Sequence, residues 1–341
     1  MTADRSPDGR FRELDVLRGL AAVSVILFHY SRHGTRYYAD YPFDFGIGKY
    51  GVHLFFVISG FVIYYTLERS RTVSDFLFSR FSRLYPTYWV ALGLLLVLDI
   101  TTGEGRIWWN GYLVNASMLQ KFCGFPDLDD LYWTLGIELA FYGLMALVFV
   151  LGQMARIVPI GFVWLLAAAV WSHFHHYTGP DERSIATTYL ILPYAPYFLS
   201  GIAFYLGYAR GWRPSYLCLI GTALVVAGLI HGSAVAWITA GIFSAVALAV
   251  VGGLRFLTGR FSLWLGAISY PLYLVHRALG YRFLDTMNTR HVPYLVAFGV
   301  AVAGALCLAQ ILSVTVERPA MHALRAWYRQ GLNRSRVERQ V

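Results

Sequence analysis

The first apolar segment of the chain carries two ionisable residues whose types and spacing suit chemistry. Arg18 and His29 are eleven residues apart, which on a helix places them about 16 Å apart along the axis and about 20° apart around it. Asp15 lies close to the same face. Arginine binds anions and histidine exchanges protons near neutral pH, so we interpret this face as one path into a helix bundle. The alternative is that Arg18 reaches the lipid headgroups and His29 caps the opposite interface.

Two further arginines, Arg80 and Arg83, are three residues apart, just before an apolar segment that begins at Leu84. On a helix this spacing puts both side chains on one face. Planar guanidinium groups suit bidentate binding of phosphate, and this pattern predicts a phosphate clamp at the cytoplasmic mouth of the bundle. The alternative is that both arginines are topology anchors on the cytoplasmic side.

Glu138 is a carboxylate about two turns inside a later apolar segment, and at that depth it needs a partner. Because this segment is expected to run antiparallel to the first, Glu138 and His29 should lie at similar depth. We therefore expect Glu138 to orient the His29 imidazole and to stabilise its cation. The alternative is a structural hydrogen bond between helices.

The elements that must position these residues are transmembrane helices. Of the 341 residues, 57% are hydrophobic, 17% are aromatic and only 14% are charged, which excludes an ordinary soluble globular protein. Apolar runs of about 17–25 residues, each long enough to cross a bilayer, recur along the chain. The sequence thus predicts an all-α polytopic bundle of about ten transmembrane helices, at 14–31, 47–67, 84–101, 132–151, 157–174, 186–206, 214–231, 233–252, 262–280 and 293–315.

The distribution of basic residues predicts that both termini are cytoplasmic. Arg18 lies inside the first span. Of the other 27 Lys and Arg residues, eighteen fall on the side of the membrane that holds the N-terminus and nine on the opposite side. Basic residues are retained in the cytoplasm. The net charge of +9 then indicates contact with membrane lipids, not nucleic acid. We expect a cytoplasmic tail at 1–13, a transmembrane bundle at 14–316 and a basic cytoplasmic tail at 317–341. The three cysteines have no zinc-binding spacing, and no metal site is expected.

Several segments together resemble the membrane-bound acyltransferase family 3, a family of bacterial glycan O-acyltransferases. Arg18 and His29 are similar to its arginine-x10-histidine signature, and Arg80 and Arg83 to its Arg-x-x-Arg motif. The other similar segments are Gly51–Phe61, which contains Ser59, then Trp133–Glu138, which contains Thr134, Ser269–His276, and Val316–Pro319. His53 and Leu139 depart from the family pattern, and we assign neither of them a role.

The resemblance implies transfer of an acyl group, expected to be acetyl, from cytoplasmic acyl-CoA to a hydroxyl of a glycan or glycosylated acceptor. Arg80, Arg83 and Arg18 would bind the donor. His29 would act as general base or carry the acyl group itself, with Glu138 orienting it. Asp15, Ser59, Thr134 and His276 would support the site. Acetyl-CoA is then a substrate, no permanently bound cofactor is expected, and the location is the inner (cytoplasmic) membrane.

The alternative function is a polytopic transporter that exports glycan units through a buried proton relay of arginine, histidine and glutamate. Repeated halves with matching broken helices would indicate it, and the sequence has none. A non-enzymatic membrane scaffold does not explain ionisable groups at membrane depth.

The basic-residue asymmetry gives a testable topology. Reporter fusions at residues 10 and 335 should both report a cytoplasmic location, because an even number of spans returns the chain to its starting side. Opposite locations for the two fusions would show that the number of spans is odd.

Overall fold

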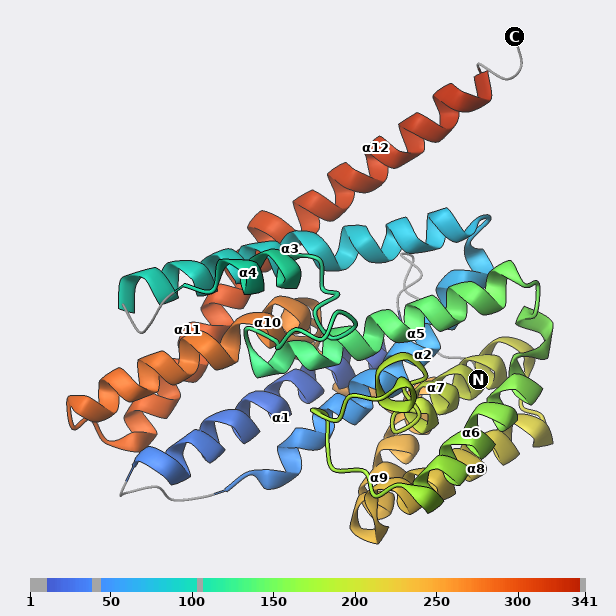
Figure 1. The fold of residues 1–341 in the computed structure, drawn as a ribbon, viewed down its shortest axis with the longest axis horizontal. Helices are drawn as coiled ribbons and strands as arrows, with labels where there is room; N and C mark the ends of the chain where they lie inside the picture. Colours follow the sequence, from blue (N-terminus) through green and yellow to red (C-terminus); the bar gives the residue numbers. More distant parts are fainter. Residues whose placement is uncertain (1–10, 39–43, 103–106, 338–341) are drawn as a thin grey trace.

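The computed structural model of the protein describes residues 11–38, 44–102 and 107–337, and these ranges form a bundle of α-helices without a strand (Figure 1). The predicted all-α fold is confirmed. Ten long helices correspond to the ten predicted spans: α1 (Arg12–Tyr37), α2 (Gly51–Arg69), α3 (Val73–Thr102), α5 (Trp133–Val150), α6 (Ile157–Phe174), α7 (Ala195–Arg210), α8 (Pro214–His231), α9 (Ser233–Val250), α10 (Arg260–Thr289) and α11 (Tyr294–Leu312).

Eight segments of the described chain are long and apolar enough to cross a membrane, and they include all of these helices except α7 and α10. α7 has only 16 residues, yet almost its entire length is buried inside the bundle. α10 has 30 residues, and its central part, which contains Ser269 and His276, is also buried. Both helices therefore owe their place to packing against other helices more than to contact with lipid.

Several helices differ in length from the predicted spans, and three of these differences matter because of their position. α3 begins at Val73, so Arg80 and Arg83 lie two turns inside a helix and not in a loop before it. α7 begins at Ala195, after a separate π-helical turn at Ile185–Tyr189, although a span had been expected from residue 186. The predicted C-terminal tail is largely a helix, α12 (Arg318–Val337).

α1 and α10 pack along each other through glycines, which let their backbones touch. A Cβ atom added to Gly19 of α1 would lie 2.7 Å from the backbone nitrogen of Gly266, and one added to Gly266 would lie 2.2 Å from the backbone oxygen of Asp15. Because these neighbours are backbone atoms, they cannot turn aside as a side chain can. The two helices are therefore held at a fixed separation.

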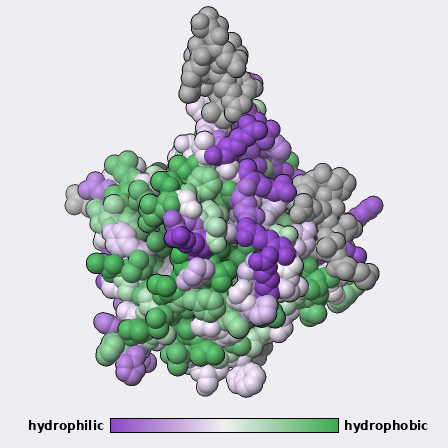
Figure 2. All heavy atoms as spheres, turned by 90° about the vertical axis from the view of Figure 1, so that its right-hand side faces the viewer, coloured by the Kyte–Doolittle hydropathy of each residue, from purple (hydrophilic) through white to green (hydrophobic). Residues whose placement is uncertain are grey.

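α12 leaves the bundle obliquely (Figure 1) and contacts the first half of α3. The rings of Phe78 on α3 and Tyr328 on α12 stack with their centroids 4.3 Å apart, and the Tyr328 hydroxyl donates a hydrogen bond of 3.1 Å to Asp75. Figure 2 shows the adjacent end of the bundle, where hydrophilic residues form a band bordered by hydrophobic ones. This pattern fits a bundle whose end meets water and whose sides meet lipid.

The close contact of α1 and α10 can be tested by substitution. Gly266→Ala should destabilise the protein by about 1–3 kcal/mol, because the added methyl group forces two backbones apart. Gly299→Ala on α11 is the matched control, since nothing lies within 4 Å of its added Cβ. Thermal unfolding of both variants in the same detergent measures the difference. Equal unfolding temperatures would contradict this account of the packing.

Candidate active site

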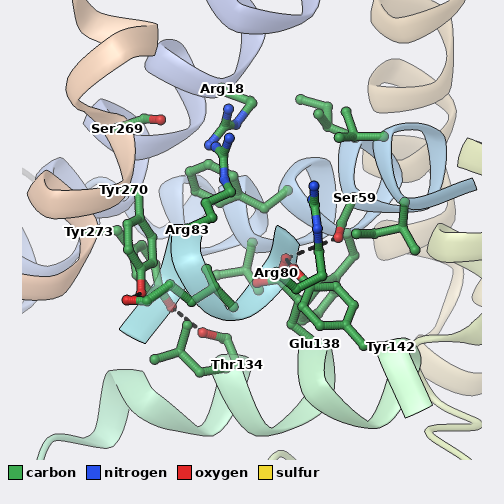
Figure 3. Close-up of a pocket in the computed structure, with 18 residues that line it drawn as sticks. Arg18, Ser59, Arg80, Arg83, Thr134, Glu138, Tyr142, Ser269, Tyr270 and Tyr273 are labelled. Carbon is green, nitrogen blue, oxygen red and sulfur yellow. Dashed lines mark hydrogen bonds between the residues drawn. The ribbon is translucent and has the colours of Figure 1, made fainter. Parts of the chain in front are cut away.

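A cavity of about 100 Å³ lies between α1, α2, α3, α5 and α10, and we call it the arginine cavity (Figure 3). Its charged lining residues are Arg18, Arg80, Arg83 and Glu138. Three of the predicted donor-binding residues and one predicted catalytic residue thus meet in one place. Three positive groups face one negative group, which makes the cavity suitable for an anion.

Arg80 is the clearest sign of a missing partner. Its side chain is only 8% exposed, and its Nε atom has no hydrogen-bond partner among the described residues. Nη2 of the same guanidinium donates to Ser79 Oγ, at 3.1 Å, and the group also interacts with Tyr142 and Glu138. A buried donor without a partner is costly, so this arginine is prepared to bind an acceptor group that enters the cavity.

Glu138 does not contact His29, contrary to the expectation from their depth. Its Oε1 atom accepts hydrogen bonds from Ser59 Oγ, at 3.2 Å, and from the Tyr142 hydroxyl. Figure 3 shows these groups together with Arg80. The prediction that Glu138 orients His29 is therefore wrong, because depth along a helix does not determine which neighbour its side chain faces. Ser59 contributes as a direct partner of Glu138.

His29 pairs instead with His276 of α10. His276 Nδ1 lies 2.9 Å from the backbone oxygen of Tyr273 and 3.1 Å from that of Leu272. Since both neighbours are acceptors, Nδ1 of His276 carries the proton, and Nε2 is left as an acceptor.

The same reasoning assigns the proton on His29. Its Nδ1 atom lies 2.9 Å from the backbone oxygen of Val25 and 3.3 Å from Nε2 of His276. Both neighbours accept, so Nδ1 of His29 is the protonated nitrogen. Nε2 of His29 then holds the lone pair, and it makes no hydrogen bond to a described residue. His276 thereby performs the orienting task that the sequence analysis gave to Glu138.

His29 lines a second and larger cavity of about 740 Å³, which we call the histidine cavity. α1 and α10 contribute hydrogen-bonding side chains to its lining, namely His29, His33, Arg277 and Tyr281. The rest of its wall is rich in aromatic rings, namely Tyr50, His53, Trp133, Tyr177, Tyr194 and His231. A cavity of this size can enclose a small organic ligand, and its mixed lining offers both ring surfaces and polar contacts.

Val52 and Tyr273 line both cavities, so they form the partition between the arginine and histidine cavities. The Tyr273 hydroxyl is held by Thr134 Oγ1, at 2.8 Å. Thr134 therefore supports the partition and does not contact His29.

A third cavity of about 200 Å³, the terminal cavity, adjoins the arginine cavity at Arg18 and Arg83. It is lined also by Asp15, which lies 3.7 Å from Arg18, and by Glu317. The three cavities follow one another along α1 from its N-terminal end towards His29, as the common face of Arg18 and His29 predicts.

One ion-pair cluster near the histidine cavity was not expected from the sequence. Arg277 pairs with Asp129, with Nη1 and Oδ1 2.8 Å apart, and also with Asp130. Burial raises the pKa of Asp129, and the Arg277 charge opposes this change. Arg277 follows His276 in the sequence, and the two aspartates precede the Trp133 segment. These positions beside motif residues could have indicated the cluster.

The chain is similar to known acyltransferases over most of its length. A family model described as "Acyltransferase domain" matches residues 11–314. The chain is 26% identical to "Acyltransferase MdmB" of Streptomyces mycarofaciens, over 92% of each chain. It is 23% identical to "Nodulation protein 10" of Rhizobium leguminosarum bv. viciae, over 92% of this chain and 94% of the relative.

A shorter similarity joins it to "Exopolysaccharide production protein ExoZ" of Rhizobium meliloti, at 31% identity over 30% of this chain and 34% of the relative. No solved structure matches the chain. Because the family match covers nearly all of the bundle, including the arginine and histidine cavities, this chain belongs to acyltransferase family 3 and is a multi-pass membrane acyltransferase.

Proposed function

We propose that the protein transfers an acetyl group from cytoplasmic acetyl-CoA to a hydroxyl of a glycan or glycosylated acceptor, across the inner membrane in which it lies. The observation that supports this proposal is the order of the cavities. An arginine-lined cavity adjoins, across Val52 and Tyr273, the cavity that contains His29. A donor and an acceptor can thus approach one histidine from opposite ends of the bundle.

The charges that line the arginine cavity suit an acyl-CoA donor. Arg18, Arg80 and Arg83 outnumber the single carboxylate of the arginine cavity, and Arg80 keeps a buried donor without a partner. The phosphates of CoA supply several acceptor oxygens for such groups. They would remain at the Arg80 and Arg83 end while the pantetheine arm extends along the Arg18 face towards the partition.

The positions of the ring protons on His29 and His276 determine the chemistry that His29 can perform. Nε2 of His29 takes the proton of the acceptor hydroxyl while the hydroxyl oxygen attacks the thioester carbonyl. The carbon–sulfur bond then breaks, and the CoA sulfur leaves as a thiolate that receives the proton back from the imidazolium. During the step, the Nδ1 proton of His29 stays between Val25 O and Nε2 of His276, which fixes the ring and stabilises its positive charge.

The lining of the histidine cavity suits a glycan acceptor. Its aromatic rings can pack against the apolar face of a sugar ring, and its polar groups can bind the hydroxyls. The name of the exopolysaccharide production protein that resembles part of this chain supports a glycan acceptor.

The transporter alternative receives no support from the family match, which is to an acyltransferase domain. A proton relay through the bundle would also need linked titratable groups. Among the described residues, no hydrogen bond links Glu138 or its partners Ser59 and Tyr142 to the pair of His29 and His276.

Purified protein in nanodiscs, without any gradient, should transfer radiolabelled acetyl from acetyl-CoA to glycans extracted from the producing cell. His29→Gln should lower this rate by about 10²–10⁴-fold, because an amide cannot take up and return the proton. Acetyl-CoA binding should change little, since His29 lies beyond the partition.

Substitution of His322, an exposed histidine on α12, by glutamine is the matched control and should leave the rate unchanged. Wild-type protein that releases no CoA would sink the proposed function. Retention of most of the rate by a well-folded His29→Gln variant would remove proton transfer at His29 from the mechanism.

The donor arginines have a separate signature. Arg83→Ala and Arg80→Ala should each weaken acetyl-CoA binding by about tenfold or more, because each removes charge-assisted hydrogen bonds, and the acceptor KM should change much less. Titration of each substrate measures this, and Arg156→Ala, which removes an exposed arginine between α5 and α6, is the control. Unchanged donor affinity in folded variants would mean that the two arginines only anchor the topology.

A further inference from the structure

α12 brings another arginine to the donor end of the bundle. Arg325 is half-buried, and its Nε atom donates a hydrogen bond of 3.3 Å to Ser82 Oγ on α3. Ser82 lies between Arg80 and Arg83 in the sequence, so α12 places this guanidinium directly over the stretch that carries the two donor arginines. The stacking of Phe78 on Tyr328 fixes α12 in that position.

The charges around Arg325 are unbalanced. It interacts electrostatically with Arg80, Arg83 and Arg329, all of the same sign. No ion pair joins Arg80, Arg83 or Arg325 to a carboxylate in the part of the chain that the structure describes. Like charges held close together repel, and this arrangement is stabilised when an anion binds between them.

The nearby carboxylates accept hydrogen bonds from uncharged groups and do not fully balance the arginines. Asp75 accepts hydrogen bonds from the Tyr328 hydroxyl and from the Thr72 backbone nitrogen, and Glu138 accepts from Ser59 and Tyr142. The buried Nε of Arg80 has no hydrogen-bond partner among the described residues. Glu138 offsets part of the Arg80 charge and Glu317 part of the Arg83 charge. Three guanidinium groups still outnumber these two carboxylates, so the cluster of Arg80, Arg83 and Arg325 keeps a positive excess that suits an anion.

We propose that Arg325 completes a polyanion site with Arg80 and Arg83, and that this site binds the phosphates of the nucleotide part of CoA. The inference rests on the proposed function and adds to it the distinction between the two ends of the donor. Arg18, further along α1, faces the pantetheine arm, whereas the arginine of α12 recognises the adenosine 3′-phosphate and diphosphate. The C-terminal helix is thus a part of the donor site and not a detached basic tail.

The probes are CoA and adenosine 3′,5′-bisphosphate, which lacks the pantetheine arm. With full-length protein in nanodiscs, both should bind to the wild type. Arg325→Ala should weaken each by about tenfold or more, and Arg325→Lys should recover part of the loss, because it restores the charge without the planar fork. Arg213→Ala, which removes an exposed arginine between α7 and α8, is the charge-matched control and should bind both probes as the wild type does.

Two arms of the experiment separate phosphate from lipid. In nanodiscs of phosphatidylcholine alone, Arg325→Ala should still weaken the binding of both probes. In nanodiscs that also contain phosphatidylglycerol, the loss of binding should be of similar size. A loss seen only with the anionic lipid would mean that Arg325 serves lipid headgroups, and the inference would fall.

The remaining outcomes are also decisive. Wild-type protein that binds neither probe would contradict the proposed function itself. Wild-type binding that Arg325→Ala leaves unchanged, in protein with a wild-type unfolding temperature, would contradict only the role of Arg325.

Discussion

The direct contact between the backbones of α1 and α10 is the constraint on which the rest of the site depends. Gly19 and Gly266 bring the two helices together, and farther along the same pair His29 and His276 lie 3.3 Å apart. Backbone carbonyls fix the tautomer of His276. Its accepting Nε2 atom and the Val25 carbonyl then fix the tautomer of His29. The spacing of two helices thus decides which ring nitrogen is available for chemistry.

The site also separates charges of different purpose. Arginines that suit phosphate lie at one end of the row of cavities, and the histidine pair lies beyond the partition of Val52 and Tyr273. In a low-dielectric bundle, a cation beside an imidazole would disfavour its protonation. Arg277 lines the same cavity as His29, but Asp129 and Asp130 pair with it and balance its charge. Glu138 lies with Arg80, where its charge balances part of the positive excess.

Much of this could be read from the sequence. The length and spacing of the apolar runs predicted ten of the long helices, although not α12. Helical periodicity placed Arg18 and His29 on one face. The pairing of Glu138 with His29 was predicted wrongly, because depth in the membrane is a one-dimensional quantity and the rotation of each helix is set by packing. The roles of His276 and of α12 depend on contacts between residues more than 240 positions apart, which local patterns do not contain.

The two walls of the histidine cavity have different origins, and this has an evolutionary consequence. His29 and Arg277 come from the rigid α1 and α10 pair, whereas Lys49, Tyr177 and Pro180 come from short turns and connections between helices. Connections tolerate substitution and changes of length better than packed helices do. The wall formed by these connections can therefore change without disturbing the packing of α1 against α10 that holds His29.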